Sequence, residues 1–195
     1  MPRQPREVSV CDVYHFMSRG VHRKELFHAS ADYSYYLDLT GKYARKLQLE
    51  IFHYCLMPNH THFLVKADEI SRLSCFAHYV QREYVFFYRK KYNWSGQVFQ
   101  RCFASKPIND DIYLLECGRY IERNPLDAGL VQDLALYPYS SYTFYAHATH
   151  NLLITPSPAY NSLSINLSER RSIYKFYVAQ MRPKLQETAK STLPF

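Results

Sequence analysis

The sequence predicts an α+β fold in which helices cover an antiparallel sheet. Short runs rich in β-branched and aromatic residues are bounded by turn residues, as is typical of strands. Longer segments repeat apolar residues at the period of an amphipathic helix. Both kinds of segment follow one another along a single chain of 195 residues, a length that fits one domain with an appendage.

The first third of the chain predicts one helix between strands. Residues 13–18 (VYHFMS) form a short strand that ends in a turn. From Ser30, the expected N-cap, apolar residues recur at helical spacing and predict a helix that ends near Gln48. Residues 49–56 and 61–66 then predict two strands, and the MPNH between them has the turn chemistry of a hairpin.

The next segments predict two more helices and a fourth strand. Residues 70–92 follow the helical pattern closely until NWSG interrupts it. Residues 98–108 predict a strand, and residues 110–124 predict a third helix that Pro125 should stop. The order of strand, helix, two strands, helix, strand and helix matches a ferredoxin-like sandwich, an antiparallel sheet with helices on one face.

The pattern weakens after about Tyr145, so we expect one folded domain over residues 1–145. Residues 146–195 begin with a stretch rich in Ser, Asn, Thr and Pro, which predicts a loop. Ser168 is then the expected cap of a final helix containing ERRSIYKFYVAQM, and a polar tail follows.

The composition favours a reduced protein with an anionic partner. Lysine and arginine total 24 against 17 acidic residues, which gives a formal net charge of +7. The 19 tyrosines and 12 phenylalanines supply rings that stack on bases as readily as they fill a core. Five cysteines form no CxxC pair, and no apolar run is long enough for a membrane helix. We expect a cytoplasmic protein with no membrane partner, because the first residues also lack an apolar signal segment.

The stretch LMPNHTHFLV (56–65) places two histidines two residues apart on a predicted strand. Side chains alternate between the faces of a strand, so His60 and His62 point the same way. Two imidazoles on one face can share a metal ion. The alternative is that they are ordinary polar residues on a half-exposed strand, and a third ligand is needed to decide between the two interpretations.

Tyr120 and Asn124 stand four residues apart near the end of the third predicted helix. They therefore share one face of that helix about one turn apart, while Leu114, Cys117 and Ile121 face the core. A tyrosine hydroxyl beside an amide oxygen offers a nucleophile and a metal ligand. The alternative is that Tyr120 is one tyrosine among many and that an Asn before Pro merely ends the helix.

Together these four side chains would suit phosphoryl transfer. Two neutral imidazoles and a neutral amide bind a divalent cation without cancelling its charge, so the cation can act as a Lewis acid on a phosphodiester. Tyr120 would attack phosphorus and form a covalent link to DNA, which conserves the phosphoester energy for rejoining. A reaction that ends in hydrolysis needs no such tyrosine.

Several motifs resemble those of a known family. They are YHFMSRGVHRKELF (14–27), YCLMPNHTHFLV (54–65), RYIERNPLDAGLV (119–131) and YPYSSY (137–142). On these motifs the chain resembles the REP-associated tyrosine transposases, a branch of the single-tyrosine HUH transposases. The likeness covers about residues 1–145 and extends faintly into the helix near 168–181.

The resemblance implies a ferredoxin-like HUH domain with His60 and His62 as the metal-binding pair. It implies that Tyr120 is the nucleophile and that Asn124 is the third ligand, with Mg²⁺ or Mn²⁺ as cofactor. The implied substrate is single-stranded DNA, in palindromic hairpins, and cleavage would leave a 5′-phosphotyrosine and a free 3′-OH. Ligand softness alone would favour Mn²⁺ or Zn²⁺ over Mg²⁺. The sequence leaves open whether the protein acts as a monomer or a homodimer.

Two segments carry candidate DNA contacts, because cations track phosphates while rings stack on bases. The first segment contributes Arg89, Lys90, Lys91, Tyr92, Trp94 and Arg101. The alternative is that these residues belong to the charged end of a helix and to the core of a hairpin that follows it. The second candidate patch contributes Arg19, Arg23 and Lys24. We expect His15, His22, His53 and His78 to be structural, since none has a partner at ligand spacing.

Two other functions remain open. The chain could bind palindromic DNA hairpins without cutting them, although such a binder has no need to retain Tyr120 and three metal ligands. It could instead be a metal-dependent phosphodiesterase that uses water, in which case Tyr120→Phe should leave cleavage intact.

Overall fold

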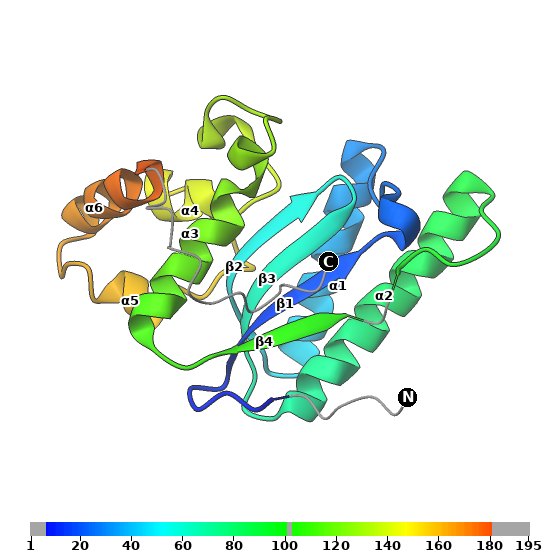
Figure 1. The fold of residues 1–195 in the computed structure, drawn as a ribbon, viewed down its shortest axis with the longest axis horizontal. Coiled ribbons are helices and arrows are strands. Elements are labelled where there is room, and N and C mark those ends of the chain that lie inside the picture. The colour runs from blue at the N-terminus through cyan, green and yellow to red at the C-terminus, as the bar shows by residue number, and fades with distance from the viewer. Residues whose placement is uncertain (1–6, 101–102, 181–195) are drawn as a thin grey trace, which may run out of the picture.

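The computed structural model describes residues 7–100 and 103–180. In this part of the chain four strands form one antiparallel sheet in the order β2-β3-β1-β4 (Figure 1). The strands are β1 (Val13–Arg19), β2 (Glu50–Met57), β3 (His60–Lys66) and β4 (Ala104–Ile108). This topology confirms the predicted α+β fold with an antiparallel sheet.

The two long helices α1 (Ser30–Lys46) and α2 (Ile70–Tyr92) pack together and cover one face of the sheet. The side chains on this face are aromatic. The Phe16 ring of β1 lies 6.0 Å from the Phe63 ring of β3 and 5.8 Å from the Phe76 ring of α2, centroid to centroid. All three rings are fully buried, so the alternate residues of β1 and β3 must point to the opposite face.

The third long helix, α3 (Asp111–Asp127), covers that opposite face over β2 and β3. It lies in front of the sheet in Figure 1, with α1 behind. The predicted core residues Leu114, Cys117 and Ile121 are buried against Phe52 and Leu64. The expectation that helices lie on one face therefore holds for α1 and α2, whereas α3 forms a third layer.

Helix α3 continues through Pro125 to Asp127, so the predicted stop before Pro125 is wrong. A proline has no N–H, which leaves the carbonyl of Ile121 without its helical partner. The side chain of Asn124 supplies the missing donor, because its Nδ2 donates to Ile121 O at 3.2 Å and to Tyr120 O at 2.7 Å. The local cost of the proline is thus offset inside the helix.

Other element boundaries also differ from the expectations. Helix α1 is capped at Ala29 rather than Ser30 and ends two residues before Gln48. Strand β4 begins at Ala104 rather than at residue 98. Among the described residues before it, Gln100 N donates to Arg19 O at the end of β1, and the Phe103 ring lies 5.1 Å from the Phe16 ring of β1. In β4, Pro107 is tolerated because this strand lies at the edge of the sheet.

The chain after α3 contains short helices that pack back on α3. The elements outside the sheet and the three long helices are η1 (Val21–Arg23), η2 (Leu134–Leu136), α4 (Tyr142–His147), α5 (Pro158–Asn161) and α6 (Leu167–Ala179). The predicted loop after residue 145 therefore contains α5. Asn166, rather than Ser168, caps α6, because its side chain accepts the amides of residues 168 and 169.

A fully buried carboxylate, Glu122, connects α3 to its surroundings. It accepts hydrogen bonds from Ser141 Oγ at 2.6 Å and from Tyr174 of α6 at 2.7 Å, and it lies 2.9 Å from His53 Nδ1 of β2. These bonds fix α3 against both the sheet and α6.

No helix within the described residues is long and apolar enough to cross a membrane.

Candidate functional site

A cleft of about 270 Å³ opens between the sheet and α3. Its walls come from β1, β3 and α3, which are remote from one another in sequence. The lining residues are Met17, Ser18, Arg19, His60, His62, Tyr120 and Asn124. All four side chains predicted to carry the chemistry therefore border one cavity.

The two histidines point into this cleft because of the strand register. Antiparallel pairing places His60 opposite Arg19 and His62 opposite Met17. The rings of His60 and His62 lie 4.9 Å apart, centroid to centroid, on the face that α3 partly covers. The prediction that the two imidazoles share a face is confirmed.

Both imidazoles of the pair are held neutral. Burial, followed by the nearby Arg19 guanidinium, lowers the pKa of His60 to about 4. Burial is also the largest cause that lowers the pKa of His62, and His15 and His60 lower it further. Neutral imidazoles keep a lone pair at physiological pH, which is the form that binds a metal ion.

The ring orientation of His60 is fixed by Asn59. The two side chains are joined by a hydrogen bond of 2.5 Å between His60 Nδ1 and Asn59 Oδ1. The amide is oriented in turn by Arg23, whose carbonyl accepts Asn59 Nδ2 at 3.2 Å. An amide oxygen only accepts, so Nδ1 of His60 is the donor and its lone pair lies on Nε2.

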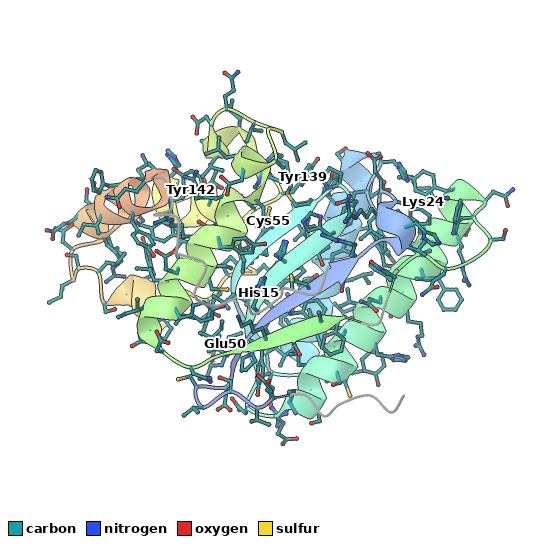
Figure 2. All side chains as sticks on the ribbon, in the orientation of Figure 1. His15, Lys24, Glu50, Cys55, Tyr139 and Tyr142 are labelled. Carbon is teal, nitrogen blue, oxygen red and sulfur yellow. The ribbon has the colours of Figure 1, made fainter. Side chains whose placement is uncertain are left out.

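His15, expected to be structural, lies beside the predicted site. Its Nε2 is 3.0 Å from His62 Nδ1, and its ring meets Tyr120 edge-on with centroids 5.8 Å apart. Figure 2 shows His15 on the sheet face next to α3. Spacing along the chain did not indicate this contact, because His15 and His62 are 47 residues apart. The contact follows from the pairing of β1 with β3 together with the alternation of side chains between the two faces of each strand.

Tyr120 and Asn124 enter the cleft from α3, one turn apart. The Tyr120 ring stands edge-on to His62, with centroids 5.6 Å apart. Because Asn124 Nδ2 is occupied by two helix carbonyls, the amide oxygen Oδ1 is the atom left for a ligand in the cleft. The sequence Asn-Pro thus both continues the helix and orients the amide.

This donor set fits a divalent cation. Two imidazole nitrogens and an amide oxygen are neutral ligands of the type that Mn²⁺ accepts, and Mg²⁺ accepts the oxygen more readily than the nitrogens. Across residues 7–100 and 103–180, no three His, Cys, Asp or Glu side chains gather as a metal site. A three-ligand protein site in this cleft therefore needs a ligand of another type beside the two histidines, and the Asn124 amide oxygen is of a suitable type.

The chain matches a known protein family. The family model described as "Transposase IS200 like" matches residues 9–124, which include the two histidines and extend through Tyr120 to Asn124. The chain belongs to the IS200-like transposase family. This match confirms the resemblance inferred from the sequence motifs.

Solved structures similar to this chain include that of the REP-associated tyrosine transposase bound to a REP hairpin. The two share 17% identity with a TM-score of 0.60, over 80% of this chain and 93% of the other. A putative transposase from Deinococcus radiodurans R1 is 16% identical, with a TM-score of 0.43 over 63% of this chain and 97% of the other. Curated protein sequences give no significant match.

Three of the candidate DNA contacts, Arg19, Lys24 and Trp94, lie near one another beside the cleft. Arg19 lines the cleft itself. Beyond it, η1 runs beside the segment after α2, because Val21 N donates to Val98 O at 2.9 Å. The Lys24 ammonium lies 4.1 Å from the centre of the Trp94 ring, and Figure 2 labels Lys24 near the C-terminal end of α2. The two sequence segments that predicted separate patches therefore meet.

Several predicted contacts are already engaged within the protein. Lys91 Nζ donates to Asp32 Oδ1 at 2.5 Å, and the Tyr92 hydroxyl donates to Asp32 Oδ2 at 2.6 Å. Arg89 donates to the carbonyl of Gly96 at 2.6 Å, which shapes the loop after α2. Lys90 is exposed on α2, and Arg101 lies outside the described residues.

Proposed function

We propose that this transposase cleaves and rejoins single-stranded DNA through a covalent bond to Tyr120. The supporting observation is that one cleft contains Tyr120, His60, His62 and Asn124, although they come from two elements far apart in sequence. The two pairs were predicted from independent motifs. A structural role for either pair alone would not require them to share a cavity.

His60 and His62 would hold the cation through Nε2, and Asn124 would hold it through Oδ1. When bound, Mg²⁺ or Mn²⁺ supplies Lewis-acid polarisation of the phosphodiester. Arg19, at the rim beside His60, is positioned to pair with a phosphate oxygen. Because burial lowers the pKa of His60 to about 4, Nε2 of this ligand keeps its lone pair in the pH range where the enzyme would work.

Tyr120 is the nucleophile of the proposed reaction. Its phenolic oxygen forms a bond to phosphorus as the bond between phosphorus and the 3′ oxygen breaks. The phenolic proton ends on that 3′ oxygen, so the products are a 5′-phosphotyrosine and a free 3′-OH. The reverse reaction with a second 3′-OH rejoins the strand without a nucleotide cofactor.

We further propose that the substrate is a hairpin formed by palindromic single-stranded DNA. The motif resemblance is to the REP-associated branch, and the protein of similar fold was solved with a REP hairpin. The surface formed by η1 and Trp94 lies next to the cleft and would contact such a hairpin. In this proposal residues 1–145 are the catalytic unit, and α6 stabilises α3 by packing against it.

The test uses oligonucleotide hairpins labelled at the 5′ end or the 3′ end, incubated with Mn²⁺ or with EDTA. We expect a metal-dependent adduct between protein and the 3′-labelled fragment, and a shortened 5′-labelled fragment. Tyr120→Phe should lose both products. Tyr113→Phe, a matched change at a more exposed tyrosine on the same helix, should retain them.

Cleavage that survives Tyr120→Phe would replace this proposal with a hydrolase that uses water. Hairpin binding without cleavage, in every metal tested, would instead identify a non-catalytic binding protein.

A further inference from the structure

The contact between His15 and His62 is a hydrogen bond between two buried imidazoles. The exposed fraction is 4% for His15 and 3% for His62, so water does not compete for this bond. Two imidazole nitrogens 3.0 Å apart form a hydrogen bond only when one carries the proton and the other offers a lone pair, so one nitrogen of the pair donates while the other accepts.

Only one of the two arrangements is compatible with a metal ligand at His62. If His15 Nε2 donated to His62 Nδ1, the single proton of His62 would be on Nε2, and that nitrogen could not bind a cation. If His62 Nδ1 donates to His15 Nε2, the lone pair of His62 lies on Nε2. The second arrangement gives His62 the same tautomer that Asn59 imposes on His60.

We infer that His15 is a positioning residue that accepts the Nδ1 proton of His62, and thereby fixes Nε2 of His62 as the metal-binding atom. This inference rests on the proposed metal site. It assigns each histidine of the pair its own acceptor, an amide oxygen from the β2–β3 turn for His60 and an imidazole from the neighbouring strand for His62.

The same ring also contacts the proposed nucleophile. His15 meets Tyr120 with an interplanar angle of 76°, and His62 meets Tyr120 at 83°. The three rings pack as one group, so a His15 that holds His62 in place also limits the orientations open to Tyr120. A residue that only filled space would not need a nitrogen facing His62.

Two substitutions separate the hydrogen bond from the packing. His15→Phe keeps an aromatic ring against Tyr120 but removes the acceptor. His15→Gln returns an acceptor oxygen at about the distance of Nε2 from the backbone. Urea unfolding of both variants shows whether either change disturbs the fold as a whole.

The first readout needs no metal. Long-range ¹H–¹⁵N spectra of the metal-free protein report the tautomer of each histidine, and His62→Gln identifies the His62 signals. We expect wild-type His62 to carry its proton on Nδ1, His15→Phe to give a mixture of tautomers, and His15→Gln to restore the wild-type state.

The second readout is Mn²⁺ affinity, measured from the free Mn²⁺ signal in electron paramagnetic resonance. We expect His15→Phe to lower the affinity by about 10- to 100-fold, as is usual for the loss of a group that orients a ligand, and His15→Gln to recover most of it. Adduct formation should fall in parallel.

The inference is overturned if wild-type His62 carries its proton on Nε2, or if His15→Phe binds Mn²⁺ as wild type does. A wild type that does not bind Mn²⁺ overturns the metal site of the proposed function and this inference with it. If His15→Phe does not fold, two measurements still decide. A wild-type His62 proton on Nδ1, together with near wild-type Mn²⁺ affinity in His15→Gln, supports the role. A wild-type proton on Nε2, or a loss of Mn²⁺ affinity in His15→Gln, opposes it.

Discussion

Gly118 of α3 lies against the ring of His53 in β2, and a methyl group at position 118 would stand 2.7 Å from His53 Nε2. The ring has no room to retreat, because it is fully buried and stacks on Tyr145 with centroids 4.3 Å apart. The absence of a side chain at residue 118 therefore sets how closely α3, with Tyr120 and Asn124, approaches the sheet.

Gly118→Ala should displace α3 and impair the cleft. We expect a loss of about 1–3 kcal/mol in the free energy of unfolding from overpacking, together with weaker Mn²⁺ binding. Urea denaturation and the Mn²⁺ titration measure the two effects.

Gly41→Ala in α1 is the matched control for this change. Its new methyl group would approach only the mobile end of Arg45, at 3.3 Å, and the Leu153 side chain, at 3.8 Å. In a helix interior this substitution should stabilise by about 0.5–1 kcal/mol. Equal effects of the two substitutions would show that the contact with His53 is not limiting.

Asp32 should make the stability depend on pH. Its carboxylate is fully buried and accepts hydrogen bonds from the amides of His28 and Ala29, and from Lys91 and Tyr92. Burial raises the pKa of Asp32, but these four partners outweigh burial and place the pKa below its usual value. The folded state then binds fewer protons than the unfolded state, so the stabilisation is present above about pH 4 and is lost as the pH falls through the folded pKa.

Asp32→Asn tests this dependence. We expect it to lower the free energy of unfolding at pH 7 by about 1.5–3 kcal/mol, because charged hydrogen bonds are lost. It should also flatten the decline of stability between pH 5 and pH 3 (about one unit either side of the ordinary value). Asp38→Asn, at an exposed position of the same helix, should change stability by no more than about 0.5 kcal/mol. Parallel curves for wild type and Asp32→Asn would contradict the assignment.

Local patterns predicted each half of the site. Strand alternation placed His60 and His62 on one face, and helical spacing placed Tyr120 beside Asn124. That the two pairs meet depends on how α3 packs across the sheet, which no local pattern encodes. Their complementary chemistry suggested the link, and the family resemblance supported it. The same limit explains why His15 was missed, since its role depends on which strand pairs with β1.

Two local rules failed because side chains compensated for them. Proline usually ends a helix, but Asn124 supplies the donor that Pro125 lacks, and α3 continues. Charged and aromatic residues near a helix end often face a ligand, but Lys91 and Tyr92 are bound to the buried Asp32, which is remote in sequence. Both compensations are visible only when the partner atoms are known.

Lys24 and Lys91 should behave differently in DNA binding, although both were predicted as contacts. Lys24 is exposed and lies over the Trp94 ring, so Lys24→Ala should weaken binding to a hairpin and reduce the slope of log affinity against log salt by about 0.7–0.9. Lys91→Ala should leave that slope unchanged and lower stability instead, because Asp32 loses its cationic partner. Fluorescence anisotropy across a salt series measures the slope, and equal slopes for the two variants would exclude this distinction.

Pro125→Ala should separate stability from metal binding. The new alanine N–H can bond to the carbonyl of Ile121, which restores a helical hydrogen bond worth up to about 3 kcal/mol relative to proline, less the packing lost from the buried ring. We therefore expect little or no loss of stability.

The Asn124 amide, however, then has to share the Ile121 carbonyl, and its orientation toward the cleft is less fixed. Mn²⁺ affinity should fall, though less than in Asn124→Ala, which removes the ligand oxygen altogether. Urea denaturation and the Mn²⁺ titration of the same preparations measure both quantities. An affinity as high as that of the wild type would show that the Tyr120 carbonyl alone orients the amide, and that the proline has no part in shaping the site.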